Sequence, residues 1–302
     1  MAELGDLFVR LLISHMATHI EHHYVPRFLL KQWHTRPDDK LTSFRWEHGQ
    51  LISDRYKAKS VAKEPHLYSM ERSQTVPNVK VEKEFWGPHI DDPAALVHAK
   101  MLNKGINGLN LEDKKAWSPF LVSLMLRGPT MIHHIRERGR DTLLESLDKD
   151  PDEFLAIRGD EPEATLREWV EKHMPDVLDD LGVMSLPELA FSEKLNLALL
   201  NVTWGIRSVH AARFDLLIGD RPLIVGGTFE TSFLVALPIS PTKIFFALNN
   251  EETLANMKDR DHDEFVRLAN LSTVVDAERY VFATNTRQEQ FVKKFLREPN
   301  SI

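Results

Sequence analysis

The sequence predicts an α+β fold, in which a small mixed or antiparallel sheet is built from an N-terminal hairpin and C-terminal strands, with a large helical middle section. Three observations support this prediction. Extended segments with turn residues between them occur before residue 70 and again after about residue 206, and helical periodicity dominates the region between. Strands at both ends of a chain can share one sheet. The 302 residues, 42% of them apolar, are typical of a folded protein.

The N-terminal elements are predicted from proline and turn signals. Pro26 suits the start of a helix, because its missing N–H costs nothing there, and the preceding Val25 is pushed to an extended conformation. A β-hairpin follows, and then a third extended segment. The hairpin strands are expected at Leu41–Trp46 and Leu51–Arg55, and the third segment around His66–Met70.

The middle of the chain alternates apolar helical faces with proline breaks. Residues 81–101 predict a helix with a break near Gly87-Pro88. Residues 112–126 predict a second helix, which Gly128 and Pro129 terminate. Residues 141–200 predict several short helices, with breaks or starts at Asp150-Pro151, Glu161-Pro162 and Leu186-Pro187.

The C-terminal part is predicted to be rich in strands. Four apolar runs are separated by turn residues, and a long helix from Asp263 to Ala283 follows them, since its apolar residues recur near a period of 3.6. A final helix is expected around Phe291–Leu296. The expected strands are Phe214–Ile218, Leu223–Val225, Ser232–Leu237 and Lys243–Leu248.

Charge is distributed unevenly along the chain. The formal net charge is −7, but residues 141–200 contain 16 acidic and 5 basic side chains, so the rest of the chain is net basic. We interpret residues 20–302 as one domain, residues 141–200 as an acidic helical insertion within it, and residues 1–19 as an N-terminal extension with helical spacing. The negative net charge of the whole chain therefore does not exclude an anionic substrate.

The composition also excludes several classes of protein. The chain contains no Cys, which excludes disulfides, thiolate metal sites and a Cys nucleophile. No apolar run reaches the roughly 18 residues of a membrane span, and the start of the chain does not read as a secretory signal. We therefore expect a cytoplasmic protein that does not bind a membrane.

Three side chains at element boundaries are candidates for catalysis. His23 stands at the X-Pro entry to the first helix, where the backbone positions an imidazole that can act as acid, base or metal ligand. Asp220 follows an apolar strand, and Arg127 ends an apolar helix, where a guanidinium can bind phosphate. Each has a structural alternative: a helix cap for His23, a turn for Asp220 and a C-terminal cap for Arg127.

A fourth candidate, Glu84, belongs to an acidic cluster with Glu82, Asp91 and Asp92. Glu84 and Asp91 are seven residues apart, so they share a helix face if the helix continues through Gly87-Pro88. Two carboxylates and a His would suit a divalent metal as cofactor. A solvated acidic face is the alternative explanation.

Basic residues with interleaved aromatic residues lie on and after the predicted hairpin. Basic side chains bind phosphates and aromatic rings stack on exposed bases, so nucleic acid is an expected partner. Arg27, Arg45 and Lys57 are the expected substrate contacts. Solvated hairpin residues would give the same pattern.

The segment His22-His23-Tyr24-Val25-Pro26-Arg27-Phe28-Leu29-Leu30-Lys31-Gln32-Trp33 resembles the opening signature of the domain-of-unknown-function family 4238, whose members are mostly bacterial. The family's Ser-Asp-x-Pro turn is similar to Gly219-Asp220-Arg221-Pro222, with Gly219 in place of Ser. The resemblance implies no assigned activity, but it implies that His23, Arg127 and Asp220 belong to recurring motifs. Other segments that resemble the family are Val81–Trp86, Arg127-Gly128-Pro129, Pro238-Ile239-Ser240-Pro241 and Asn270.

Two hypotheses about function remain open. In the first, the chain is a nuclease-like hydrolase that cleaves phosphodiester bonds of nucleic acid. His23 is then general base or metal ligand, and Asp220 and Glu84 are its carboxylate partners, while Arg127 stabilises the anion. In the second, the chain is a non-enzymatic protein-binding module. His23, Arg127 and Asp220 then form a structural polar network, and residues 141–200 contact a basic protein partner.

Overall fold

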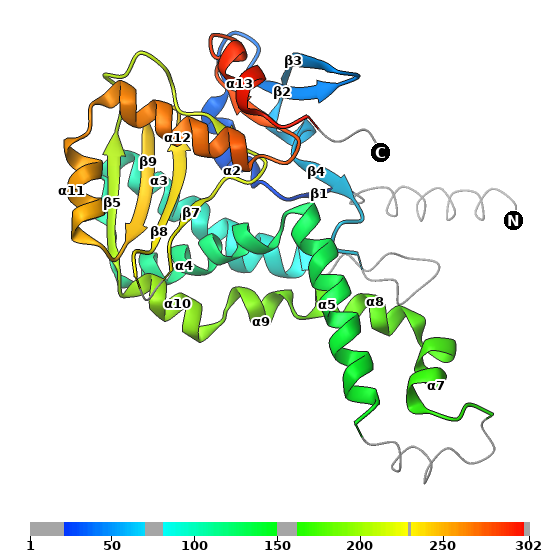
Figure 1. Cartoon of the computed structure of the whole chain (residues 1–302). Helices are drawn as coiled ribbons and strands as arrows, with labels where there is room; N and C mark the ends of the chain where they lie inside the picture. The colour runs from blue at the N-terminus through cyan, green and yellow to red at the C-terminus, as the bar shows by residue number, and fades with distance from the viewer. Residues whose placement is uncertain (1–20, 70–80, 150–161, 229–230, 299–302) are drawn as a thin grey trace, which may run out of the picture. The chain divides into compact units, whose positions relative to one another are not determined.

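The structure is a computed structural model, and it describes residues 21–69, 81–149, 162–228 and 231–298. Helices and antiparallel sheets make up these residues, which confirms the predicted α+β class (Figure 1). Within these ranges, no helix has the length and apolar character needed to cross a membrane. The predicted N-terminal extension, residues 1–19, lies outside the described residues.

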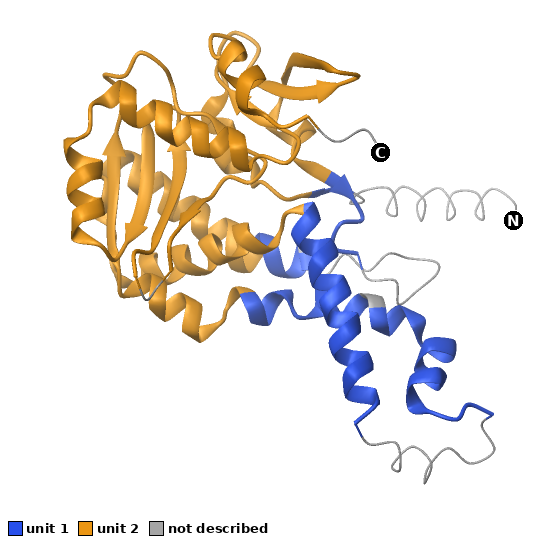
Figure 2. Cartoon of the chain, viewed as in Figure 1, with its two compact units in different colours: residues 1–22, 64–87, 129–189 blue, residues 23–63, 88–128, 190–302 orange. Residues whose placement is uncertain are grey.

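The chain folds into two compact units, each built from several segments (Figure 2). Unit 1 comprises residues 1–22, 64–87 and 129–189, and unit 2 comprises residues 23–63, 88–128 and 190–302. Most of the predicted acidic insertion belongs to unit 1, together with two segments from earlier in the chain.

The first sheet of unit 2 joins the two ends of the chain, as predicted. Its strand order is β3-β2-β10-β6, and β10 pairs antiparallel with both β2 and β6. The hairpin turn between β2 and β3 places His48 and Gly49 at positive φ, which is typical of the two-residue turns that match strand twist. The strands are β2 (Leu41–Glu47), β3 (Gln50–Tyr56), β6 (Ile218–Gly219) and β10 (Val281–Ala283).

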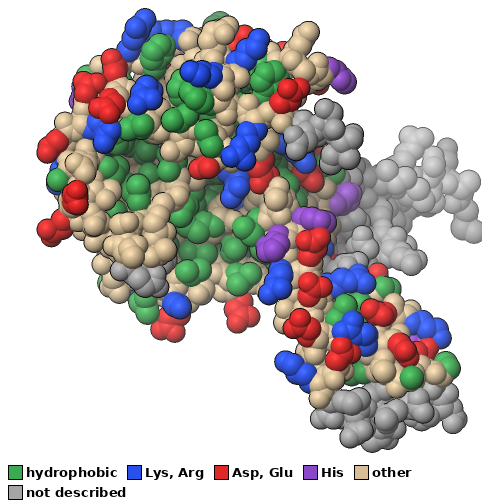
Figure 3. All heavy atoms as spheres, in the orientation of Figure 1, with side chains coloured by type: hydrophobic (Ala, Val, Ile, Leu, Met, Phe, Trp, Pro, Cys, Tyr) green, Lys and Arg blue, Asp and Glu red, His purple; other side chains and the backbone are tan. Residues whose placement is uncertain are grey.

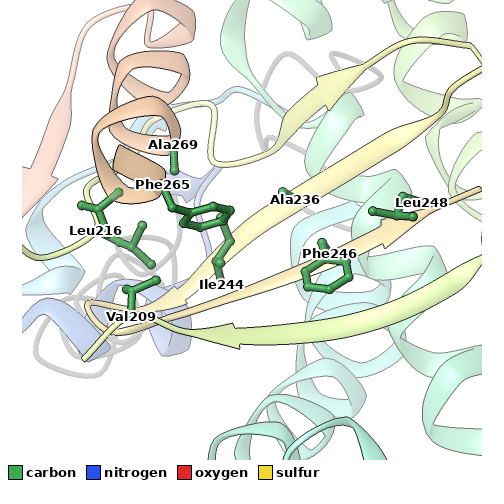
Figure 4. Packing of buried hydrophobic residues seen from close by; sticks show 9 residues of the cluster. Val209, Leu216, Ala236, Ile244, Phe246, Leu248, Phe265 and Ala269 are labelled. Atoms are coloured by element: carbon green, nitrogen blue, oxygen red, sulfur yellow. The ribbon is translucent and has the colours of Figure 1, made fainter. Parts of the chain in front are cut away.

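The second sheet of unit 2 has helices on both faces. On one face, Phe246 of the sheet belongs to the same buried cluster as Phe265 and Ala269 of a long helix (Figure 4). On the other face, Phe245 packs edge-on against Trp117, with ring centroids 5.8 Å apart. Burial on both faces explains why the two central strands, residues 234–240 and 243–248, are almost continuously apolar. The strand order is β5 (Thr203–Ser208), β9 (Lys243–Leu248), β8 (Leu234–Ser240) and β7 (Ile224–Gly226).

The helices of unit 2 begin with side-chain caps where the sequence supplies them. Asn110 and Asp113 form a capping box, and the Asp261 carboxylate accepts from two backbone N–H groups at the start of the long helix. The helices are α2 (Arg27–Leu30), η1 (Lys31–Trp33), η2 (Ala58–Ser60), α3 (Asp92–Lys104), η4 (Ile106–Gly108), α4 (Leu111–Leu126), α10 (Glu193–Leu200), α11 (Glu251–Asp259), α12 (His262–Asp276) and α13 (Glu289–Phe295).

Several predicted boundaries were wrong. The helix expected from Asp263 to Ala283 ends at Asp276, and its last expected residues form β10. The strand expected at Phe214–Ile218 is reduced to β6, and β5 was not predicted. The break expected at Gly87-Pro88 does not occur, because a π-helical segment, whose wider turns accommodate Pro88, runs through it.

The remaining elements include the helices of unit 1 and a short two-stranded sheet of order β1-β4. The third extended segment is β4, which ends at Pro65, before the range in which it was expected. A small cluster of Leu144, Val170 and Leu178 forms a core of unit 1. These elements are β1 (Glu21–His23), β4 (Lys63–Pro65), η3 (Val81–Asp91), α5 (Pro129–Leu147), α7 (Leu166–His173), α8 (Pro175–Met184) and α9 (Leu186–Ala190).

In unit 1, α5 and α8 approach closely at two glycines. A Cβ added to Gly182 would lie 2.8 Å from the Cα of Arg136, and one added to Gly139 would lie 2.8 Å from the backbone N of Gly182. Gly182→Ala is therefore expected to destabilise this helix pair by about 1–3 kcal/mol. Hydrogen exchange should become faster in α5 and α8. Gly128→Ala is the control, because its added Cβ meets nothing within 4 Å.

Candidate functional site

The N-terminal motif is built mainly into the core. His22 is buried in unit 1, where its Nδ1 accepts the backbone N–H of Tyr68 at 2.9 Å and its ring stacks on the ring of Tyr68. In unit 2, Trp33 is fully buried and its indole Nε1 donates to the carbonyl oxygen of Leu216 at 2.7 Å. Tyr24 and Val25 are also buried. Most of the motif therefore serves packing.

His23 is the partly exposed member of the motif. Its Nε2 lies 3.2 Å from the carbonyl oxygen of Lys59. A carbonyl oxygen is only an acceptor, so the bond requires a proton on Nε2. The next residue, Tyr24, donates its backbone N–H to the carbonyl oxygen of Ala62 at 3.0 Å. The position of His23 is thus fixed against the segment that carries η2.

Arg127 is buried at the C-terminal end of α4, with 1% of its surface exposed. Its Nη1 donates to both carboxylate oxygens of Asp91, at 3.0 and 3.2 Å, and its Nη2 donates to the hydroxyl of Ser123 at 2.7 Å. Burial raises the pKa of Asp91, and the Arg127 guanidinium opposes that shift. The pair joins the end of α4 to the end of η3.

Asp220 is buried after β6, with 4% of its surface exposed. Its carboxylate accepts three backbone N–H groups: Glu278 at 2.9 Å, Arg279 at 2.7 Å and Tyr280 at 3.0 Å. Burial raises the pKa of Asp220 to about 6, and the three N–H donors oppose that shift. These bonds hold the turn between α12 and β10.

Glu84 lies in η3 and is exposed in unit 1. Its predicted partner on the same helix face, Asp91, belongs to unit 2 and is bonded to Arg127. The side chain of Glu82 is not among those described. Over the described ranges, no group of three or more His, Asp and Glu side chains is arranged to hold a metal ion.

The cations of the hairpin are largely neutralised by neighbouring carboxylates. Arg45 donates to Asp54 at 3.0 Å and to Glu47 at 3.2 Å. Arg55 donates to both carboxylate oxygens of Asp38. Of the predicted substrate contacts, Arg27 and Lys57 are exposed, whereas Arg45 is half-buried. The hairpin therefore offers little positive charge to a phosphate backbone.

The predicted catalytic residues are thus placed with different partners. His23 contacts the η2 segment, Arg127 contacts η3 and Asp220 contacts the turn before β10. Glu84 lies in the other unit.

A comparison with protein-family models tests the family resemblance that the N-terminal motif suggested. The model described as protein of unknown function (DUF4238) matches residues 21–287, which is most of the chain. The chain belongs to this family. No curated protein and no solved structure matches it. The DUF4238 match begins at the motif around His22 and includes Arg127, Asp220 and Asn270.

The DUF4238 fold also presents an apolar groove that the sequence did not predict. It lies on unit 2, among α4, α10 and β7, and has a volume of about 320 Å³. Hydrophobic side chains gather on the face that carries α4 and α10 (Figure 3). We call this feature the α10 groove, and its lining consists of Val122, Met125, Leu195, Leu199, Val225, Gly227, Thr228 and Phe233.

Large apolar side chains on or just before α10, and on β7, are unusually exposed. Phe191 and Leu197 are 49% and 48% exposed, and Val225 on the edge strand β7 is 50% exposed. One sequence signal exists in retrospect: residues 195–200 carry apolar side chains at nearly every position, which is typical of a helix that is buried on all sides. In this DUF4238 protein that helix leaves some of them facing solvent, which is typical of an interaction site.

Proposed function

We propose that this DUF4238 protein is a non-enzymatic binding module that holds a partner protein in the α10 groove. The observation that carries the proposal is the groove itself, an apolar depression with the exposed side chains of Leu195, Leu197 and Val225 at or beside it. Exposed apolar patches of this kind favour protein association. We propose the cytoplasm as the place where it acts.

The contacts of the predicted catalytic residues support binding over hydrolysis. A general base or an anion-stabilising group must reach the reacting atoms. Arg127 and Asp220 are instead buried and bonded to a carboxylate and to backbone N–H groups, respectively.

The groove indicates the chemistry of its partner. Its lining is apolar apart from Thr228 and contains no charged side chain, so the partner must insert apolar side chains. A volume of about 320 Å³ suits a few large apolar side chains, and an amphipathic helix presents such anchors from one face. Separately from the groove, the acidic character of residues 141–200 favours a basic protein as the partner of that segment.

A photo-crosslinking experiment tests the groove. A benzophenone amino acid replaces Leu195 in the full chain, and in a matched protein it replaces Leu111, which is 58% exposed on α4 but does not line the groove. Irradiation in the native cell is expected to give a discrete heavier product only from position 195. Val225→Glu is expected to reduce that product at least tenfold, because a buried unpaired carboxylate opposes association.

Three outcomes would contradict the proposal. Equal crosslinking from positions 195 and 111 would mean that the groove is not selective. A product of twice the chain mass would mean that a second copy occupies the groove. Cleavage of tRNA, single-stranded DNA or duplex DNA, with or without divalent metal, would support the hydrolase if His23→Ala abolished it without changing the melting temperature.

A further inference from the structure

A second cavity of unit 2 has a different character from the α10 groove. It has a volume of about 450 Å³ and lies among α12, α13 and the loop that precedes β6. This volume is within the range of about 300–1,000 Å³ that is typical of small-molecule sites. We call it the arginine pocket, and its lining includes Arg213, Phe214, Asp263, Arg267, Arg287 and Phe291.

The arginine pocket carries unneutralised positive charge. Arg213, Arg267 and Arg287 are exposed, and within the described residues none of their guanidinium groups makes an ion pair. The carboxylate of Asp263, which also lines the pocket, accepts the backbone N–H of Arg213 at 2.6 Å. Three guanidinium groups and one carboxylate leave the pocket with an excess of positive charge.

An aromatic ring holds two of these arginines in place. The guanidinium carbons of Arg213 and Arg287 each lie 5.3 Å from the centre of the Phe214 ring. Cation–π contacts at this distance reduce the number of conformations that an exposed arginine samples. Phe214 therefore brings together two cations that lie 74 residues apart in the chain.

A polar network centred on Asn270 joins the chain segments that line the arginine pocket. The side chain of Asn270, which is buried, donates to the carbonyl oxygen of Asp215 and to the side chain of Gln288, both at 2.9 Å, and accepts the backbone N–H of Leu217 at 2.8 Å. Gln288 donates to the same Asp215 carbonyl oxygen at 2.8 Å. The network fixes the three chain segments that supply the arginines.

We propose that the arginine pocket binds a nucleotide through its phosphate group. A guanidinium presents paired N–H donors that match phosphate oxygens, and it is weakly hydrated, so convergent arginines favour phosphate over smaller anions. The planar guanidinium groups and Phe291 also offer surfaces on which a base stacks. The inference is independent of the α10 groove.

Calorimetric titration of the full chain with AMP, adenosine and inorganic phosphate tests the inference. AMP is expected to bind, phosphate to bind more weakly at the same site, and adenosine to bind at least tenfold more weakly than AMP. Arg287→Gln is expected to reduce the affinity for AMP at least tenfold. Arg221→Gln, which removes an exposed arginine of unit 2 outside the pocket, is expected to change it less than twofold.

A second variant tests whether AMP binding depends on the positions of the arginines as well as on their charge. Phe214→Leu keeps all three arginines but removes the ring that holds two of them, so it is expected to weaken AMP binding by roughly threefold to tenfold, and Phe214→Tyr is expected to restore it. Equal losses in Arg287→Gln and Arg221→Gln, or equal affinities for AMP and adenosine, would overturn the inference. Undetectable binding of both AMP and phosphate at millimolar concentration would also overturn it.

One further titration distinguishes a free nucleotide from the end of a nucleic acid as the ligand of the pocket. A short single-stranded oligonucleotide with a 5′-phosphate is titrated beside AMP. If the oligonucleotide binds more tightly and Arg287→Gln weakens both ligands equally, the pocket receives the end of a nucleic acid. If AMP binds more tightly, the ligand is a free nucleotide.

Discussion

At about pH 4, replacement of Asp220 by alanine is expected to lower the free energy of unfolding by about 2–4 kcal/mol. The carboxylate accepts the backbone N–H groups of Glu278, Arg279 and Tyr280, and the variant leaves these partly buried donors without an acceptor. Asp220→Asn is expected to cost about half as much, because its amide keeps one oxygen but points its NH₂ group at a backbone N–H donor.

Chemical denaturation with urea measures this loss. Asp276→Ala is the matched control, since Asp276 is an exposed carboxylate at the end of α12. The control is expected to change the free energy of unfolding by less than about 0.5 kcal/mol. Equal losses in the two variants would show that the carboxylate of Asp220 has no special role in the turn. The catalytic hypothesis makes the opposite prediction, a variant that loses activity and keeps its stability.

The stability that Asp220 contributes is expected to depend on pH. Its pKa in the folded chain is about 6, above the ordinary 3.8 of an Asp carboxyl, because burial disfavours the charged form. The folded chain therefore binds the proton more tightly than the unfolded chain between these two values. The contribution of Asp220 to the free energy of unfolding is fully present below pH 4. As the pH rises through 6, it falls by up to about 3 kcal/mol.

The difference in unfolding free energy between the native chain and Asp220→Asn isolates this titration. It is expected to shrink steadily from pH 4 to pH 7 and then to remain constant. A difference that grows with pH would mean that the three N–H donors outweigh burial and hold the pKa below its ordinary value.

Breaking the pair between Arg127 and Asp91 is the second large effect that we expect. Asp91→Ala removes the carboxylate that accepts two hydrogen bonds from Nη1 of the buried Arg127 guanidinium, while the Ser123 hydroxyl still accepts from Nη2. Removal of one partner of a buried ion pair typically costs about 3–5 kcal/mol. Arg127→Met is expected to cost less, because the side chain of Asp91 is 26% exposed and water can solvate it.

A double-mutant cycle measures the coupling between these two residues. The double variant is expected to lose less stability than the sum of the single variants, with a coupling of roughly 1–3 kcal/mol. Strict additivity would mean that the pair contributes nothing as a pair. Either result concerns the free energy of unfolding, so neither requires an assay of activity.

The parts of the fold that the sequence predicted depend on local signals. The hairpin was predictable because the His48-Gly49 turn lies between two short strands, and both adopt positive φ in the structure. The family relationship was predictable because the motif at His22–Trp33 is compact in sequence, and most of its residues are buried. The start of α12 was nearly correct, since Asp261 caps it.

The end of α12 was not predictable from its own residues. Apolar periodicity continues to Ala283. The carboxylate of Asp220, however, accepts the backbone N–H groups of residues 278–280, so these groups cannot form the hydrogen bonds that would continue the helix. A contact from 58 residues earlier in the chain thus overrides the local preference. The same reason explains why both pockets were missed, because the lining of each comes from segments far apart in sequence.

The central position of β10 has a consequence for synthesis of the chain on the ribosome. β2 cannot receive its second partner, β10, until residue 281 has emerged, which at about 5–20 residues per second is roughly 10–50 s after the hairpin has been made. During that time the hairpin exposes an unpaired strand edge that invites contact with other nascent chains. Translation that stops before Val281 would leave both β2 and β6 without their shared neighbour, so such products are natural clients for chaperones and proteases.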